Sequence, residues 1–469
     1  MNKEAKFQEL PLNKLENYIE QPWNIIESYF DGQHLKRMVR HQIESYNDFV
    51  SYQIKKTINM FNPLIIKSPK DYDENLKKYG LELVITFDNF HIYRPHTYEN
   101  NGATKVMFPC EARLRNFTYA SSMTLDINIK IIKRSGENLE NIQIKHKKLS
   151  KIHIGKIPIM LKSCICVLNQ YTHLNNEILG ECNFDAGGYF IINGSEKTVL
   201  GQERAAENKV YCFNSVKAGK WSWIAEIKSV PDFKIISPKH IIMMIANKNN
   251  GFGNPIYIQL PRLKQPIPLF ILFRALGIIS DEEICDYIML NKEKNNKILY
   301  AIRGSIVDSN EYLTQNQCYE YFVKNVTYTP INMTQEEGRN KKLEFAEDIL
   351  INDLFPHCKT KEQKIFFLGY MANKLICSSL DMYSQDDRDS YLNKRIDLAG
   401  TLLNNLFRNY FNKMVKDIQK QVIKEINNGS WRSTDSYENI ITKTNIYKIV
   451  KSTTIENGIK RALSTGDFG

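Results

Sequence analysis

A short apolar run that ends in an Asn-Gly pair constrains this fold more than any other stretch of the chain. Tyr189 to Ile192 form a β-prone run, and Asn193-Gly194 follows at once. Both residues of that pair tolerate positive φ, so the pattern predicts a buried strand that turns back in a tight hairpin. Lys197 lies just past the turn, where a rigid hairpin could hold its ammonium against a phosphate. The residues alone leave open a purely structural hairpin with solvated charges.

The same stretch resembles a family signature. GGYFIINGSEK, followed by Gln202-Glu203-Arg204, resembles a signature of the second-largest subunit of multisubunit DNA-directed RNA polymerases, of the archaeal, eukaryotic and large-DNA-virus type. The resemblance runs from Pro22 to Gly469. It is carried further by the blocks PCEARLRNFTYASSMTLDI, IGKIPIMLKSCICVL, LFPHCK, FFLGYMANKLI, DDRD with its following KR, and GIKRALSTGDFG.

Length and composition set broad limits. The 469 residues suffice for two or three domains, and 63 basic against 52 acidic side chains give a net charge of +11, consistent with a polyanionic partner. The nine cysteines include no Cys-x-x-Cys pair, so neither a zinc ribbon nor a disulfide framework is indicated. The charged N-terminus lacks a signal-peptide core, and the apolar windows are shorter than the ~20 residues of a membrane span. We expect a soluble intracellular protein with no membrane partner.

Hydrophobic periodicity predicts an α+β chain. Residues 12–60 have helical spacing, and residues 80–165 alternate as strands do. The family resemblance implies a turn from Ser45 to Phe49 within the first of these stretches. Between 205 and about 385, strand-like segments give way to helices, including one expected to be capped at Ser280-Asp281. Apolar residues at 398, 402, 403, 406, 407 and 411 then share one face of a helix.

The resemblance implies a mixed multi-domain architecture, a protrusion-like domain with an inserted lobe-like domain. We expect residues 1–204 and 393–454 to form the protrusion-like domain, 205–392 the lobe-like domain, and 455–469 the start of a fork. The resemblance covers about the first two-fifths of such a subunit. We therefore expect the C-terminal part to be supplied separately, through a split gene, an intron or intein site, or to be lost by truncation.

Charged clusters give two further expectations. Arg113 and Arg115 are two residues apart, so in a strand both would face the same side, toward phosphate or an acidic partner. Asp386, Asp387 and Asp389 could hold magnesium, or they could pair with neighbouring cations in a turn. Because the family uses this segment as a structural junction, we favour pairing with Arg388, Lys394 and Arg395.

No catalytic residue is predicted in this chain. It contains no Gly-x-Ser-x-Gly elbow, Walker loop, Rossmann fingerprint or His-x-x-x-His spacing, and we predict no metal ligands. Basic residues near turns remain as sequence-blind phosphate contacts. The predicted nucleic-acid-binding residues are Lys197, Lys394, Arg395, Lys460 and Arg461.

The resemblance implies one side of a DNA cleft that contacts the RNA–DNA hybrid during RNA synthesis. The implied partners are the largest polymerase subunit, other polymerase subunits, the missing C-terminal part of the same subunit, DNA and the hybrid. Mg²⁺ would act in the assembled enzyme, held mainly by the largest subunit. The implied location is the nucleus, or a virion or cytoplasmic factory for a viral protein. Two alternatives remain open: a stand-alone nucleic-acid-binding or transcription-regulating protein derived from such a subunit, and a metal-dependent nuclease.

Overall fold

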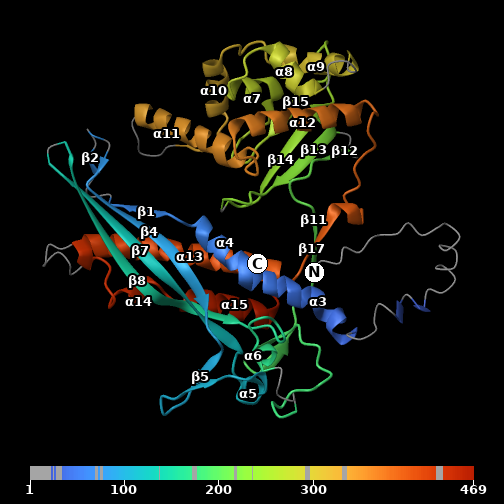
Figure 1. Ribbon diagram of the computed structural model, residues 1–469. Helices are drawn as coiled ribbons and strands as arrows, with labels where there is room; N and C mark the ends of the chain where they lie inside the picture. The colour runs from blue at the N-terminus through green and yellow to red at the C-terminus, as the bar shows by residue number, and fades with distance from the viewer. Residues whose placement is uncertain are drawn as a thin grey trace, which may run out of the picture. The chain divides into compact units, whose positions relative to one another are not determined.

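The chain folds into two compact units. The first is built from Met1–Gln202 together with Asp397–Gly469, and the second from the intervening Glu203–Ile396. Both mix helices with sheets, which confirms the predicted α+β multi-domain class (Figure 1). Residues 12–22, 25 and 28–33 of the predicted helical stretch lie outside the described part of the chain. The computed structural model describes residues 23–24, 26–27, 34–68, 72–73, 76, 78–136, 138–171, 177–215, 219–234, 236–290, 296–329, 335–428 and 437–468.

A four-stranded antiparallel sheet in the order β1-β4-β7-β8 organises the first unit. In β4 the alternation of apolar residues buries Leu81, Leu83, Ile85 and Phe87 on one face, as a period of two requires. The strands are β1 (Leu64–Lys67), β4 (Leu81–Ile92), β7 (Ala120–Ser135) and β8 (Asn141–Pro158).

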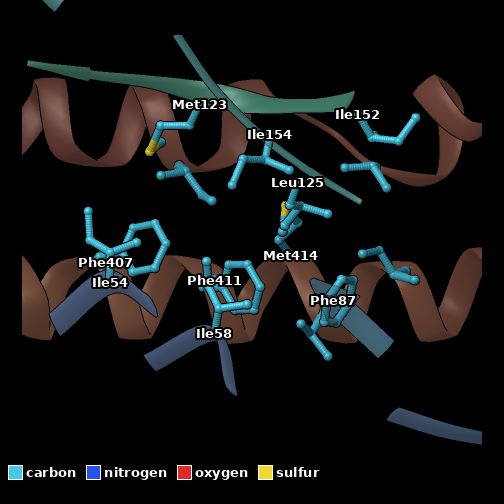
Figure 2. Close-up of a cluster of buried hydrophobic side chains, with 14 of the residues drawn as sticks. Ile54, Ile58, Phe87, Met123, Leu125, Ile152, Ile154, Phe407, Phe411 and Met414 are labelled. Carbon is cyan, nitrogen blue, oxygen red and sulfur yellow. The ribbon is translucent and has the colours of Figure 1, made fainter. Parts of the chain in front are cut away.

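The long helix α13 (Ala399–Asn428) supplies the other side of this core. Figure 2 shows Phe407, Phe411 and Met414 of this helix facing side chains of β7 and β8. The Phe411 ring centroid lies 5.6 Å from that of Phe407 and 5.6 Å from that of Phe87. The predicted apolar helix face is therefore confirmed. It packs against strands that lie more than 240 residues earlier in the sequence.

Several other helical segments of this unit pack against α13. α3 (His34–Asp48), a π-helical turn (Phe49–Gln53) and α4 (Ile54–Met60) contact it, so the turn predicted from Ser45 to Phe49 is wrong: the helix continues there. α15 (Thr453–Thr465) packs on α13 and β8, and lies within the first unit. The names protrusion and fork stay predictions. Smaller elements are β2 (Tyr72–Asp73), β3 (Lys78–Tyr79), β5 (His96–Tyr98), β6 (Thr104–Val106), α5 (Pro109–Leu114), α6 (Val167–Gln170), β9 (Phe190–Ile192), β10 (Ser195–Lys197), a 3₁₀ turn (Tyr437–Asn439) and α14 (Ile446–Ile449).

The second unit is a five-stranded sheet, in the order β12-β13-β14-β15-β16, with helices packed against it. Ser280 is the N-cap of α8 as predicted, although its side chain makes no capping hydrogen bond. The name lobe stays a prediction. The strands of this sheet are β12 (Tyr211–Asn214), β13 (Trp221–Ser229), β14 (Lys239–Ala246), β15 (Ile256–Gln259) and β16 (Ile267–Pro268). β11 (Gln202–Ala205) and β17 (Lys394–Asp397) pair in a separate two-stranded sheet. The helices are α7 (Leu269–Ala275), α8 (Asp281–Met289), α9 (Asn296–Asp308), α10 (Gln315–Lys324), α11 (Gln335–Asp348), a π-helical turn (Ile349–Asp353), α12 (Lys361–Ser379) and a 3₁₀ turn (Tyr391–Asn393).

Candidate nucleic-acid interface

The predicted hairpin is present in the first unit. β9 and β10 pair antiparallel around Asn193 (φ 51°) and Gly194 (φ 80°), which is the left-handed geometry that an Asn-Gly turn supplies. A Cβ on Gly194 would lie 2.6 Å from Oδ1 of Asn116 and 3.0 Å from the carbonyl oxygen of Arg113. Both the backbone conformation and the close approach therefore require glycine at this position.

Backbone hydrogen bonds fix the hairpin onto two neighbouring segments. The Gly194 amide donates to the Phe117 carbonyl (2.9 Å), and the Tyr119 amide donates to the Ile191 carbonyl (3.0 Å). On the other side, the Leu161 amide donates to the Tyr189 carbonyl (2.9 Å). A small apolar cluster lies beneath, so the turn is held rigidly. Its buried members are Met107, Ala112, Tyr119, Ile159, Leu161, Cys166, Leu168 and Ile191.

Arg113 lies at the centre of an ion-pair network beside this hairpin. Its guanidinium donates to both carboxylate oxygens of Glu181 at 3.0 Å, to Glu196 at 2.7 Å and to the Tyr189 hydroxyl at 2.8 Å. Burial by itself lowers the pKa of Arg113, and the hydrogen bonds and charge of Glu181 more than reverse this, so the pKa is raised. Burial raises the pKa of the Glu181 carboxyl despite that arginine. The network joins α5 to the hairpin.

The arginine pair does not lie in a strand, and that prediction is wrong. Pro109 begins α5, a short helix that contains Arg113 and ends just before Arg115. Arg115 donates to Glu99 and Glu111, both at 2.8 Å. Phosphate or an acidic partner is predicted for these arginines from the sequence. Both have acidic partners, which are glutamates of this same chain.

A cavity of about 340 Å³ in the first unit brings the hairpin turn and α15 together. Asn193 of the turn, Lys156 of β8 and Lys460 of α15 line it, with Glu456 one helical turn before Lys460. Among the described residues, neither Lys156 nor Lys460 forms an ion pair with a carboxylate, in contrast to both arginines. Two lysines against one glutamate leave the cavity cationic, and the two ammonium groups suit a phosphate group.

Local packing holds α15 in this position. The Tyr410 ring of α13 lies where a Cβ on Gly458 would be, at 2.3 Å, so glycine permits close helix contact. Gly466 ends the helix with φ 78°, a common left-handed C-terminal conformation. Arg461 is exposed on this helix, and its carbonyl accepts hydrogen bonds from the Ser464 and Thr465 hydroxyls.

The five predicted nucleic-acid-binding residues divide between the two units. Lys197, Lys460 and Arg461 belong to the first unit, and Lys394 and Arg395 to the second. Lys197 is half-buried on β10 opposite Phe190, and it does not line the cavity. Sequence reasoning omitted Lys156 from the set. The sequence signal that could have identified Lys156 is its position directly after Gly155, in a family-like block and near the end of a strand.

Lys394 and Arg395 have partners within the second unit. Lys394 forms ion pairs with Glu203 (3.3 Å) and Asp389 (3.8 Å). Arg395 is exposed and donates to the carbonyls of Leu392 and Lys394. Both groups therefore take part in the local structure of the segment that leaves this unit.

The three aspartates do not converge. Asp386 accepts from Lys374 (2.7 Å) and from the Cys212 amide (2.9 Å), which differs from the predicted pairing with nearby cations. Arg388 pairs with Glu226 instead (2.6 Å), whereas the predicted contact of Lys394 with Asp389 is present. Within the described ranges, no group of three or more His, Cys, Asp or Glu side chains is arranged to hold a metal ion.

Two further features concern the whole described chain. All nine cysteines are free thiols, and six of them are buried: Cys166, Cys212, Cys285, Cys318, Cys358 and Cys377. In the part of the chain that the structure describes, no helix combines the length and apolar character of a membrane span.

Comparison with known proteins agrees with the resemblance noted from the motifs. A family model described as RNA polymerase beta subunit matches residues 37–457. The DNA-directed RNA polymerase II subunit RPB2 of Encephalitozoon cuniculi is 34% identical over 96% of this chain and 37% of its own length. The DNA-directed RNA polymerase subunit Rpo2 of Saccharolobus solfataricus is 29% identical over 96% of this chain and 35% of its own length. The subunit Rpo2N of Methanothermobacter thermautotrophicus is 26% identical, over 95% of this chain and 81% of its own length. The chain thus spans a little over a third of the length of the RPB2 relatives it matches.

Proposed function

The chain belongs to the RNA polymerase beta subunit family and corresponds to the N-terminal part of the second-largest subunit, and from that membership we propose that it acts in DNA-templated RNA synthesis. In this role it forms one side of the DNA cleft and contacts the RNA–DNA hybrid. Its partners are the largest subunit, other polymerase subunits and the remainder of the second-largest subunit. The location follows from the role, the nucleus in a cell or a cytoplasmic factory and virion for a virus.

One observation supports the contact with nucleic acid most directly. Lys156 and Lys460 line the same cavity as the hairpin turn, and among the described residues neither ammonium is paired with a carboxylate. Arg113 and Arg115 also lie in a family-like block, but the guanidinium groups of both already form ion pairs with glutamates of this chain. Cations left available beside a rigid turn suit a sugar-phosphate backbone, which every template sequence presents in the same way.

The division of labour in the assembled enzyme follows from chemistry. Nucleotidyl transfer needs two metal ions, and in our proposal Mg²⁺ is held mainly by the largest subunit. This chain then positions the hybrid through contacts that do not depend on sequence. Lys197, Lys394, Arg395 and Arg461 join Lys460 as proposed contacts, since each is a basic side chain beside a turn or helix end.

Affinity purification of the tagged chain from its native source, followed by mass spectrometry, tests the assembly. The proposal expects recovery of a largest subunit together with a polypeptide that carries the remainder of the second-largest subunit. Recovery of the chain alone, or with nucleic acid only, contradicts it and favours a stand-alone nucleic-acid-binding protein. Lys197→Glu in the assembled enzyme is expected to shorten the lifetime of elongation complexes without unfolding the chain.

A further inference from the structure

A second cavity, of about 530 Å³, lies wholly within the second unit and has no part in the proposed function. Its floor is apolar: Ala275 and Leu276 at the end of α7 and Cys358 before α12 are all buried. Ile351 of the π-helical turn stands at its rim with 58% of its surface exposed. An exposed isoleucine beside an apolar hollow is the arrangement found where an anchor side chain of another molecule docks.

The rim of this cavity is strongly basic. Lys234, Lys359, Lys361 and Lys364 line it, against a single carboxylate, Glu347. In the part of the chain that the structure describes, Lys234, Lys359 and Lys361 form no ion pair. The Lys359 ammonium lies 5.6 Å from the centroid of the Phe233 ring, which is also part of the lining. The cavity therefore combines an apolar floor with three available positive charges.

Lys364 has a different role, which is structural. Its ammonium donates to the carbonyls of Leu350 (2.9 Å) and Ile351 (2.5 Å), so it fixes the π-helical turn that carries the exposed isoleucine. Burial lowers its pKa to about 8, and the nearby positive charge of Lys234 acts in the same direction. A negative charge entering the cavity would relieve that repulsion between ammonium groups.

We propose that this cavity binds an acidic segment of a partner polypeptide, with an aromatic or large aliphatic side chain of the segment inserted between the lysines. The volume suits one or two side chains rather than a folded domain. Charge complementarity selects an acidic flank, because three unpaired lysines surround the opening. A simple inorganic anion would leave the apolar floor in contact with water, and so does not use most of the lining.

Fluorescence anisotropy with the full chain tests this directly. The probe is a short fluorescein-labelled synthetic peptide with a central Phe and Leu flanked by Asp and Glu. Two control peptides replace either the acidic residues by Asn and Gln or the Phe and Leu by Ser. The proposal expects the first peptide to bind at least tenfold more tightly than either control, since both the apolar anchor and the charge contribute.

Protein variants separate this cavity from general surface charge. Lys359→Glu combined with Lys361→Glu is expected to weaken binding at least tenfold, and Ile351→Asp to weaken it several-fold. Lys324→Glu combined with Lys341→Glu is the matched control, because these lysines lie on α10 and α11 outside the lining, and it should lose much less. Equal losses in both double variants, equal binding of the Ser control, or displacement by inorganic phosphate would each overturn the proposal. Thermal melts confirm that each variant is folded.

Discussion

Removal of the Arg113 side chain, in the variant Arg113→Met, tests how the candidate interface is held together. The guanidinium joins Glu181, Glu196 and Tyr189, and so ties α5 to the hairpin and to the segment before it. Methionine retains much of the apolar stem and removes the charge and all of the hydrogen bonds. The variant therefore leaves the Glu181 carboxylate, whose side chain is only 4% exposed, without its cation.

The expected cost follows from burial. Breaking a fully buried ion pair by removing one partner costs roughly 3–5 kcal/mol, and surface pairs contribute roughly 0–1 kcal/mol. Because the Arg113 side chain is 23% exposed, solvent screening reduces the first figure, and we expect a loss of about 2–4 kcal/mol in unfolding free energy. For a unit of this size that corresponds to a fall in Tm of roughly 5–10 °C.

The pH dependence has a definite sign. Burial already raises the pKa of Glu181 above its ordinary value, and loss of Arg113 raises it further. The penalty for an unpaired buried carboxylate is therefore present above that raised pKa and disappears as the group becomes protonated below it. The difference in stability between wild type and Arg113→Met should be larger at pH 8 than at pH 5.

Differential scanning calorimetry of the full chain at both pH values measures these differences. Glu181→Gln added to Arg113→Met removes the unpaired charge and should restore part of the stability at pH 8. Glu196→Gln is the control, because that side chain is 54% exposed and its loss should cost well under half as much. A loss below about 1 kcal/mol for Arg113→Met, or no dependence on pH, would refute the argument that Glu181 needs this partner.

Three further predictions concern stability, each measured by denaturant unfolding. Gly194→Ala should cost about 2–4 kcal/mol, since its Cβ meets Asn116 in a left-handed backbone conformation; a neutral result would show that the turn relaxes freely. Phe411→Ala should cost about 3–5 kcal/mol in the first unit, because the ring is fully buried in the core, and a loss confined to the second unit would contradict this. Thr360→Ala should cost about 1 kcal/mol in the second unit by removing the capping box that Thr360 forms with Gln363, and the first unit should be unaffected.

Local patterns predicted the local structure well. The Asn193-Gly194 turn, the strands that give way to helices after residue 205 and the apolar face containing Phe407 and Phe411 are all present, because each is determined by residues close together in sequence. The Arg113 prediction failed although a local signal existed. Pro109 is the first residue of α5, and proline is common at the first position of a helix. The alternating pattern of the surrounding stretch favoured a strand and obscured this signal.

Contacts between distant residues were beyond such patterns. Asp386 pairs with Lys374 across a turn, and Arg388 pairs with Glu226, which lies 162 positions earlier. Likewise, nothing in the separation of Lys156 from Lys460 indicates that they line one cavity. Sequence reasoning found Lys460 by its motif and omitted Lys156, because the fold alone brings β8 and α15 together.

The salt dependence of elongation-complex dissociation, in the polymerase assembled with this chain, measures whether Lys156 and Lys460 contact phosphates. Each lysine that contacts a phosphate contributes about 0.9 to the slope of log affinity against log salt concentration. Lys460→Gln and Lys156→Gln should each flatten the slope by about that amount, and should weaken binding equally on unrelated template sequences. Lys324→Gln, outside the cavity, should leave it unchanged. Slopes for Lys460→Gln and Lys156→Gln equal to that of the wild type would show that neither lysine contacts a phosphate.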